Sequence, residues 1–177
     1  MRSVLLLLAI VTVHAEDLLP RLAAAAAAVP VVNLPFVQVK TLAMLDGPLE
    51  AHGTLSLDRP HGRLELIFTG RSQLILERGH LRRLDAAGHE ETIGPEATAI
   101  AAQLQGLLDG DFSALDKLFT ITPATDGSPA LTLVPRTPEL QRFIERLELR
   151  FRSDLAAPSV MTLIATGGDA TTYTFGP

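Results

Sequence analysis

The sequence predicts an α+β protein whose centre is one long antiparallel sheet with helices packed on one of its faces. Glycines recur every eight or nine residues from Gly53 to Gly88, the spacing of turns between short strands. Helical periodicity lies outside this region, before residue 30 and over residues 95–108. Between the glycines, leucine alternates with polar residues, the period of a strand with one apolar face, over residues 54–58, 63–66 and 73–77.

The first fifteen residues have the pattern of a secretory signal peptide. Arg2 supplies a positive charge, the apolar run 4–13 follows, and cleavage is predicted after Ala15. A buried N-terminal helix is the alternative interpretation. The run is too short to span a bilayer comfortably. We therefore expect residues 16–177 to form a single exported domain, whose formal charge changes from −5 to −6 when the leader is removed.

An alanine-rich helix is predicted over residues 17–28. Asp17 suits the N-cap position, and Pro20 falls in the first turn, where its missing N–H has little effect. The run Ala23–Ala28 consists of strong helix formers, and Pro30 ends the helix. Such a helix has a slim surface and can lie close against a sheet.

The leucine-rich strands should form a meander with one apolar face. Each apolar side chain on that face contributes roughly 1.5–3 kcal/mol if it is fully covered. Two interpretations of the face stay open, an ordinary packed core and a cavity for a ligand. The residues expected on it are Leu55, Leu57, Leu64, Leu66, Phe68, Leu74 and Leu76.

The second half of the chain is expected to place helices before a further set of strands. Residues 95–108 carry Ile100 and Leu104 on one helical face, and a short second helix follows Gly110. The remaining expected elements are a hairpin of 119–121 and 130–134, a helical turn over 138–143, and strands over 145–152, 160–165 and 170–175.

The sequence contains no recognisable catalytic or metal-binding motif. It lacks the G-x-S-x-G elbow, a phosphate-binding glycine loop and the H-E-x-x-H pattern. The histidines after the leader are not spaced as a close zinc-binding pair, and the chain has no cysteine. We therefore expect no enzymatic activity, no metal and no other cofactor. The negative net charge argues against a nucleic-acid partner.

Short segments spread over residues 36–175 carry a family resemblance. In chain order they are Phe36-Val37-Gln38-Val39-Lys40, Leu42, Pro48-Leu49-Glu50, Gly53-x-Leu55, Pro60-x-x-Arg63-Leu64-Glu65, Leu108-x-Gly110-Asp111, Leu115, Leu118-Phe119, Leu131-x-Leu133-x-Pro135, Leu140, Ile144, Leu147, Gly168-Asp169 and Phe175. No single segment identifies a family by itself, whereas the complete set in this order is specific enough to indicate one. Together they resemble the LolA-like outer-membrane lipoprotein carrier family.

The resemblance implies an incomplete antiparallel β-barrel, a half-barrel with helices forming a lid over its concave face. Members of this family take lipoproteins from an inner-membrane transporter, hold the acyl chains in the concave cavity and pass them to an outer-membrane receptor. On this basis the expected lipid-binding residues are Phe36, Leu55, Leu57, Leu64, Leu66, Phe68, Leu74, Leu76, Ile100, Leu104, Leu133 and Leu149.

The expected function is therefore that of a soluble, monomeric periplasmic carrier, with an exporter and an outer-membrane acceptor as partners. The third strand departs from the family pattern, because Glu65 and Leu66 stand where the carriers often have an aromatic residue. The family also contains divergent members found beside exporter and polyene-pigment genes, and the chain is similar to those, so a different acyl or polyene lipid stays open as cargo. The alternative is a lipid-binding sensor or interaction domain that does not shuttle, similar to the RseB-type regulators.

Overall fold

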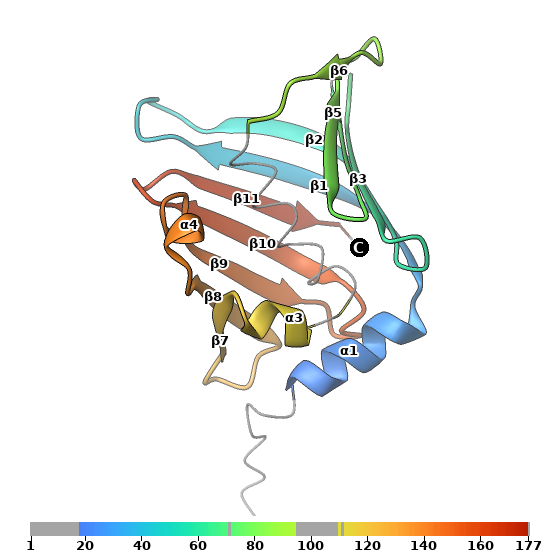
Figure 1. Cartoon of the computed structure of the whole chain (residues 1–177), viewed down its shortest axis with the longest axis vertical. Helices are drawn as coiled ribbons and strands as arrows, with labels where there is room; N and C mark the ends of the chain where they lie inside the picture. Colours follow the sequence, from blue (N-terminus) through green and yellow to red (C-terminus); the bar gives the residue numbers. More distant parts are fainter. Residues whose placement is uncertain (1–17, 71, 95–109, 111, 177) are drawn as a thin grey trace, which may run out of the picture.

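The computed structural model describes residues 18–70, 72–94, 110 and 112–176. The predicted leader, its cleavage after Ala15 and the helix expected over residues 95–108 lie outside these ranges. The described part of the chain is drawn in Figure 1.

Eleven strands in the described residues form one continuous antiparallel sheet, in the order β6-β5-β4-β3-β2-β1-β11-β10-β9-β8-β7. We name β1–β6 the N-terminal arm and β7–β11 the C-terminal arm. The N-terminal arm consists of β1 (Val31–Thr41), β2 (Leu49–Asp58), β3 (Arg63–Phe68), β4 (Gln73–Glu77), β5 (His80–Leu84) and β6 (Glu90–Glu91). The C-terminal arm consists of β7 (Phe119–Pro123), β8 (Ala130–Pro135), β9 (Ile144–Phe151), β10 (Pro158–Ala165) and β11 (Ala170–Phe175).

The first and last strands pair at the middle of the sheet. Phe36 lies opposite Phe175, and the antiparallel pairing of β1 with β11 continues to Thr41 opposite Ala170. Each arm is a meander of neighbouring strands, and among the described strands the pair that is distant in the sequence, β1 with β11, joins the two arms. The arms therefore form one continuous wall (Figure 1).

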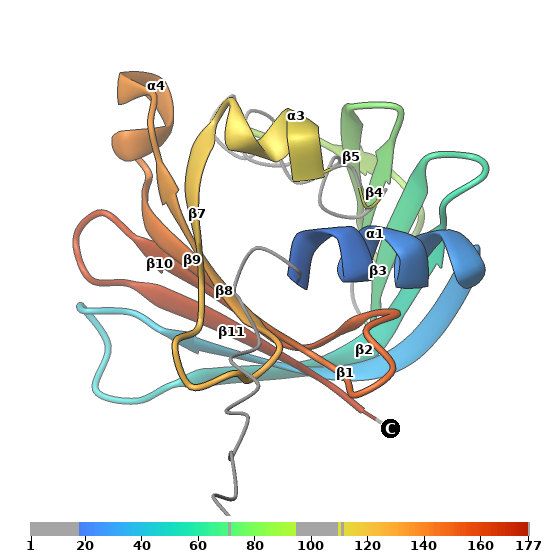
Figure 2. The ribbon, with the colours of Figure 1, turned by 90° about the horizontal axis from the view of Figure 1, so that it is seen from below.

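The sheet curves into an open trough, and two helices lie on its concave side (Figure 2). These are α1 (Leu18–Ala28) and the short α3 (Phe112–Asp116). Helix α1 ends at Ala28, as the sequence predicted. Three residues of α1 at a four-residue spacing are buried, Leu18, Leu22 and Ala26. A third helix, α4 (Pro138–Gln141), lies between β8 and β9. The structure therefore shows the incomplete barrel, and its described helical cover consists of α1 and α3.

The strand register places the predicted leucines on one face. Leu55 lies opposite Leu66, and Leu57 lies opposite Leu64. On the next strand, Leu64 faces Leu76 and Leu66 faces Leu74. Directly opposed residues of an antiparallel pair point to the same side of the sheet. The prediction that three adjacent strands share one leucine face is therefore confirmed.

The outward positions of the same strands are polar. Arg63 forms an ion pair with Glu65 on its own strand. It forms a second ion pair with Glu77 on β4, in which a guanidinium nitrogen lies 3.9 Å from a carboxylate oxygen. Ile67, the next outward residue of β3, keeps 39% of its surface exposed. The leucine alternation thus separates a dry concave face from a wet convex face.

Two groups of buried side chains stabilise the trough. The first joins α1 and α3 to the C-terminal arm through Leu22, Leu115, Phe119, Leu133 and other apolar residues. The second includes Phe36, Leu55 and Leu57 of the N-terminal arm and extends across the junction between the arms to Phe175 of β11. Met161 packs against both groups. The helices are therefore anchored chiefly to the C-terminal arm.

Gly53 is required by the close packing of Phe36 against the sheet. A Cβ atom at this position would lie 2.3 Å from the carbonyl oxygen of Ile67 and 2.5 Å from the Phe36 ring. Phe36 in turn meets the rings of Phe68 and Phe175 edge-on, at centroid distances of 5.3 and 6.4 Å. The aromatic ring covers the backbone that the glycine leaves bare.

In the ranges that the structure describes, no helix is both long enough and apolar enough to cross a membrane.

Candidate functional site

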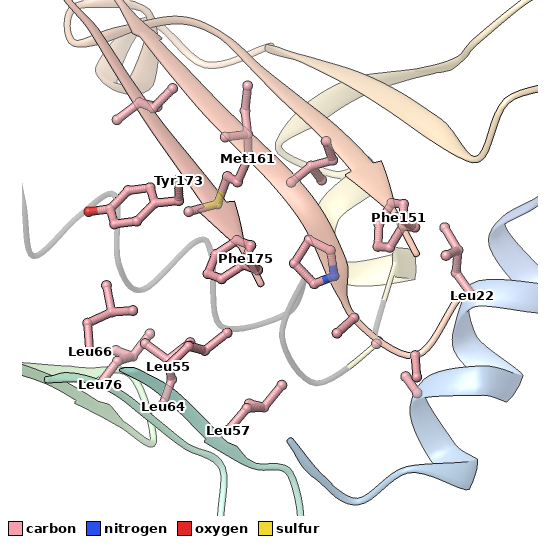
Figure 3. Close-up of a pocket in the computed structure, with 18 of the residues that line it drawn as sticks. Leu22, Leu55, Leu57, Leu64, Leu66, Leu76, Phe151, Met161, Tyr173 and Phe175 are labelled. Carbon is pink, nitrogen blue, oxygen red and sulfur yellow. The ribbon is translucent and has the colours of Figure 1, made fainter. Parts of the chain in front are cut away.

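A cavity of about 370 Å³ lies between the two arms, on the concave side of the sheet. Figure 3 shows leucines of β2–β4 facing Met161, Tyr173 and Phe175 of the C-terminal arm across it. Ligand pockets in proteins typically have volumes of about 300–1,000 Å³. The cavity is therefore large enough for part of a lipid or another apolar ligand.

One wall of the cavity consists almost entirely of leucine. Each of these side chains comes from an inward position of the N-terminal arm, so strand alternation alone assembles the wall. Most are at least 90% buried, including Leu57 with 2% and Leu66 with 7% of their surface exposed. The wall comprises Leu55, Leu57, Leu64, Leu66, Leu74, Leu76 and Leu81.

The opposite wall is more varied and comes from β9–β11 and the loop between β9 and β10. Tyr173 and Phe175 stack with their rings nearly parallel, at a centroid distance of 6.2 Å. Met161 lies beside them (Figure 3), and a thioether side chain adapts readily to irregular apolar surfaces. The other members of this wall are Leu147, Leu149, Phe151, Leu155, Ala156, Ala157, Pro158, Leu163 and Thr171.

The helices close one end of the cavity. Leu22 and Ala26 of α1 and Phe112 of α3 contribute to the lining. Gly110, which precedes α3, has a φ of +74°, and a Cβ atom there would lie only 2.8 Å from the Cβ of Ala26. The small side chain of Ala26 therefore lets Gly110 lie close to α1.

Arg59 joins three separate segments at this same end. Its guanidinium donates a hydrogen bond to the carbonyl oxygen of Val29, the residue just after α1. It donates a second hydrogen bond, with a length of 2.8 Å, to the carbonyl oxygen of Ala156. Its backbone N–H donates to the carbonyl of Pro30. The turn after β2, the end of α1 and the loop between β9 and β10 are therefore held together by one side chain.

The ammonium and hydroxyl groups that line the described cavity lie on β1 and β11, whereas the Arg59 guanidinium lies at the end closed by the helices. Gln38 is a buried polar residue on β1, and its amide donates a hydrogen bond to the Tyr173 hydroxyl. Burial raises the pKa of the Tyr173 phenol above its ordinary value, and the hydrogen bond with Gln38 opposes part of this rise. Lys40 and Thr171 also line the cavity and lie opposite each other in the register.

Seven of the twelve predicted lipid-binding residues line the cavity. Phe36 and Phe68 instead pack against each other in the core of the N-terminal arm. Leu133 is fully buried in the core of the C-terminal arm. Ile100 and Leu104 lie outside the described residues. The seven lining residues are Leu55, Leu57, Leu64, Leu66, Leu74, Leu76 and Leu149.

Sequence reasoning missed most of the opposite wall. Tyr173 was not among the predicted lipid-binding residues, and the structure places it in the lining with its hydroxyl bonded to Gln38. The alternation of Thr171, Tyr173 and Phe175 on the last strand was the available signal, since all three share one face. It did not reveal that this strand lies beside β1.

The described lining offers little for catalysis. No carboxylate, imidazole or serine hydroxyl is among the side chains that line the cavity. Within the described ranges, no group of three or more His, Cys, Asp or Glu residues is arranged to hold a metal ion. What the described cavity provides is apolar contact area with a few polar groups along one edge.

The family model for the outer membrane lipoprotein carrier protein LolA matches residues 28–176. The chain belongs to the LolA family. No curated protein matches the chain significantly. The matched range of the LolA family model includes all eleven strands of the trough.

Comparison with solved structures finds distant similarities over most of the chain. A putative outer membrane lipoprotein-sorting protein domain from Vibrio parahaemolyticus is 9% identical over 93% of this chain and 92% of its own, with a TM-score of 0.48. A LolA superfamily protein from Nitrosomonas europaea is 6% identical over 93% and 92% of the two chains, with a TM-score of 0.44. MucB in the Pseudomonas aeruginosa MucA/MucB complex is 18% identical over 91% of this chain and 55% of its own, with a TM-score of 0.42. The assignment to the LolA family rests on the family model.

Proposed function

We propose that this member of the LolA family is a periplasmic carrier that holds the acyl chains of a lipoprotein or another lipid in its concave cavity and moves them toward the outer membrane. The observation that carries the proposal is the leucine wall of the cavity, exemplified by Leu57 and Leu66. A carrier needs affinity for an apolar chain and no catalytic group, and the described lining matches that requirement.

The energetics favour an alkyl chain as the ligand. Each methylene group transferred from water into an apolar site contributes about 0.8 kcal/mol, and no directed polar contact is needed. Ten buried methylenes would therefore contribute about 8 kcal/mol before the entropy lost on binding is subtracted. An engineered cavity of about 150 Å³ lined by similar side chains already binds benzene, and the cavity here has a volume of about 370 Å³.

We further propose that α1 acts as a lid, with Gly110 packed beside it. The contact is made between Ala26 and Gly110, which have little or no side chain to interlock. Arg59 holds the C-terminal end of α1 in place through hydrogen bonds to the carbonyl oxygens of Val29 and Ala156. Opening would require these few polar contacts to break, together with the packing of Leu22. An exporter and an outer-membrane acceptor would be the donor and receiver of the lipid, and the carrier would work as a monomer.

The first experiment is mass spectrometry of small molecules extracted from protein purified from the periplasm without detergent. We expect an acylated or polyene lipid to co-purify at a fixed ratio to the protein. A protein that is empty and also fails to bind fluorescent fatty-acyl probes would contradict the proposal and support an ordinary packed core.

A transfer assay separates a carrier from a sensor. Donor vesicles containing a labelled lipid are mixed with acceptor vesicles, and the rate of transfer is followed as the protein concentration rises. A carrier increases this rate in proportion to its concentration. A protein that binds the label without accelerating transfer would instead be a sensor or interaction domain.

A further inference from the structure

Lys40 is a feature of the described cavity lining that apolar packing does not explain. In the described lining, the charged side chains are Lys40 and Arg59, and Arg59 donates to two backbone carbonyls. Lys40 forms no ion pair with any acid that the structure describes. Its side chain is half-buried in a wall that is otherwise largely apolar. An ammonium group in such a place attracts an anion more strongly than one in open water.

The surroundings of Lys40 suit a polar head group. Lys40 and Gln38 are inward residues of the same strand, two positions and therefore about 7 Å apart. Across the register lie Thr171, opposite Lys40, and Tyr173, opposite Gln38. An ammonium and two hydroxyl groups thus share one corner of the concave face. Among the described lining residues, none in this corner carries a negative charge.

The apolar wall extends away from this corner in one direction. Leu57 of the wall pairs with Val32, which lies eight residues from Lys40 along β1. At about 3.3 Å per residue, the two ends of the lining are about 26 Å apart. The far end is the one covered by α1, while the strand around Lys40 is progressively more exposed toward the hairpin that follows it. The cavity thus has one charged, accessible end and one apolar, covered end.

We propose that the cavity selects an amphiphile with an anionic head group, a carboxylate or phosphate on an alkyl chain. The head oxygens bind the Lys40 ammonium, and the chain lies along the leucine wall toward α1. This inference rests on the proposed function and narrows its cargo from lipids in general to acidic lipids. The net charge of the protein is −5, so a preference for anions has to arise at this site and not from the molecule as a whole.

The test compares four probes that share a twelve-carbon chain: dodecanoate, dodecyl phosphate, dodecanol and dodecyltrimethylammonium. Binding is measured by titration calorimetry on the full folded protein, below the micelle concentration of each charged probe and below the solubility limit of dodecanol. We expect at least one anionic probe to bind about tenfold or more tightly than dodecanol, the gain given by one charge-assisted hydrogen bond. The ratio of the two anionic affinities then identifies the head group as a carboxylate or a phosphate.

Lys40→Met is the decisive variant, and Lys117→Met is its matched control, because these are the two lysines of the chain and Lys117 is exposed. Lys40→Met should remove the preference for anions and leave dodecanol binding unchanged, while Lys40→Arg should retain the preference. Equal affinity of the unaltered protein for anionic and neutral probes overturns the inference but leaves the carrier proposal standing. An anion preference that survives Lys40→Met overturns it as well. Failure of all four probes to bind overturns both proposals.

Discussion

Leu66→Glu tests whether the leucine wall is as dry as its geometry indicates. Leu66 has 7% of its surface exposed and is bordered by Leu55 and Leu74 on the neighbouring strands. Of the cations in the described lining, Lys40 and Arg59, neither lies on a strand position next to Leu66. Leu55 pairs with Leu34, six residues and therefore about 20 Å along β1 from Lys40. Arg59 is engaged by carbonyl oxygens at the covered end. The new carboxylate would be unpaired.

The penalty depends on pH in a direction that can be worked out. Burial raises the pKa of an unpaired glutamic acid, in documented cases to about 8–9, against about 4.3 in an unfolded chain. The folded variant at pH 7 is then protonated while its unfolded form is ionised, which costs about 4 kcal/mol at about 1.4 kcal/mol per pH unit. Because the folded pKa is the higher one, the penalty is absent below about pH 4 and grows as the pH rises toward the folded pKa.

The measurement is the free energy of unfolding in urea at pH values from 4 to 7, followed by circular dichroism. Leu66→Gln is the neutral variant of similar shape, so the difference between Glu and Gln isolates the charge. Ile67→Glu places the same carboxylate one residue away on the convex face, where 39% of the side chain is exposed, and should change stability by less than about 1 kcal/mol. If Leu66→Glu and Leu66→Gln unfold with the same free energy at pH 7, the leucine wall is wet and the reasoning is refuted.

Three further predictions concern packing and polar contacts. Gly53→Ala should lower the free energy of unfolding in urea by about 1–3 kcal/mol, because the new Cβ would collide with the Ile67 carbonyl oxygen and the Phe36 ring. Gly47→Ala is the control and should have little effect, because a Cβ there meets no atom within 4 Å. Equal losses of stability in the two variants would contradict this prediction. Tyr173 keeps its proton in the folded state above pH 10, where the unfolded chain ionises, so stability should fall as the pH rises past 10, and Tyr173→Phe should reduce that fall. The ultraviolet absorbance of the phenolate reports on Tyr173 alone, because the chain has one tyrosine. If Tyr173 ionises at pH 10 while the protein stays folded, its side chain is not buried as the structure indicates. Arg59→Met should lower the free energy of unfolding by about 1–3 kcal/mol, because the carbonyl oxygens of Val29 and Ala156 lose the hydrogen bonds that Arg59 donates. Arg82→Met is the control, because Arg82 is exposed. Equal losses in the two variants would count against this role of Arg59.

The faces of the strands could be predicted because side-chain direction is a local property. In β3, Leu64 and Leu66 are separated by one polar residue, which is enough to place both on the same side of any sheet. The helix ending at Ala28 could be predicted for the same reason, because alanine propensity and a following proline act within a few residues. The structure confirms both expectations.

The division between cavity and core could not be predicted from periodicity. Phe36, Leu57 and Leu133 all occupy inward strand positions, and only Leu57 lines the cavity. The difference arises from what lies opposite each residue. Phe36 meets other rings, and Leu133 meets the buried side chains that anchor α1 and α3 to the C-terminal arm. These partners are distant in the sequence, so no local pattern records them.

The pairing of β1 with β11 is the other long-range feature that the sequence does not show. Gln38 and Tyr173 are 135 positions apart, yet their hydrogen bond joins the two arms inside the cavity. Their separate strands were recognisable, whereas their adjacency depends on how both meanders close. Tyr173 therefore became a candidate for ligand contact only when the register was known.

The alternation in β3 also separates two kinds of evolutionary change. Leu64 and Leu66 face the trough, while Arg63 and Glu65, their immediate neighbours in the chain, form an ion pair on the outside. Substitutions at one set change the lining of the trough, and substitutions at the other change the charge of the convex surface. Because adjacent codons mutate separately, the two faces of this strand can diverge independently.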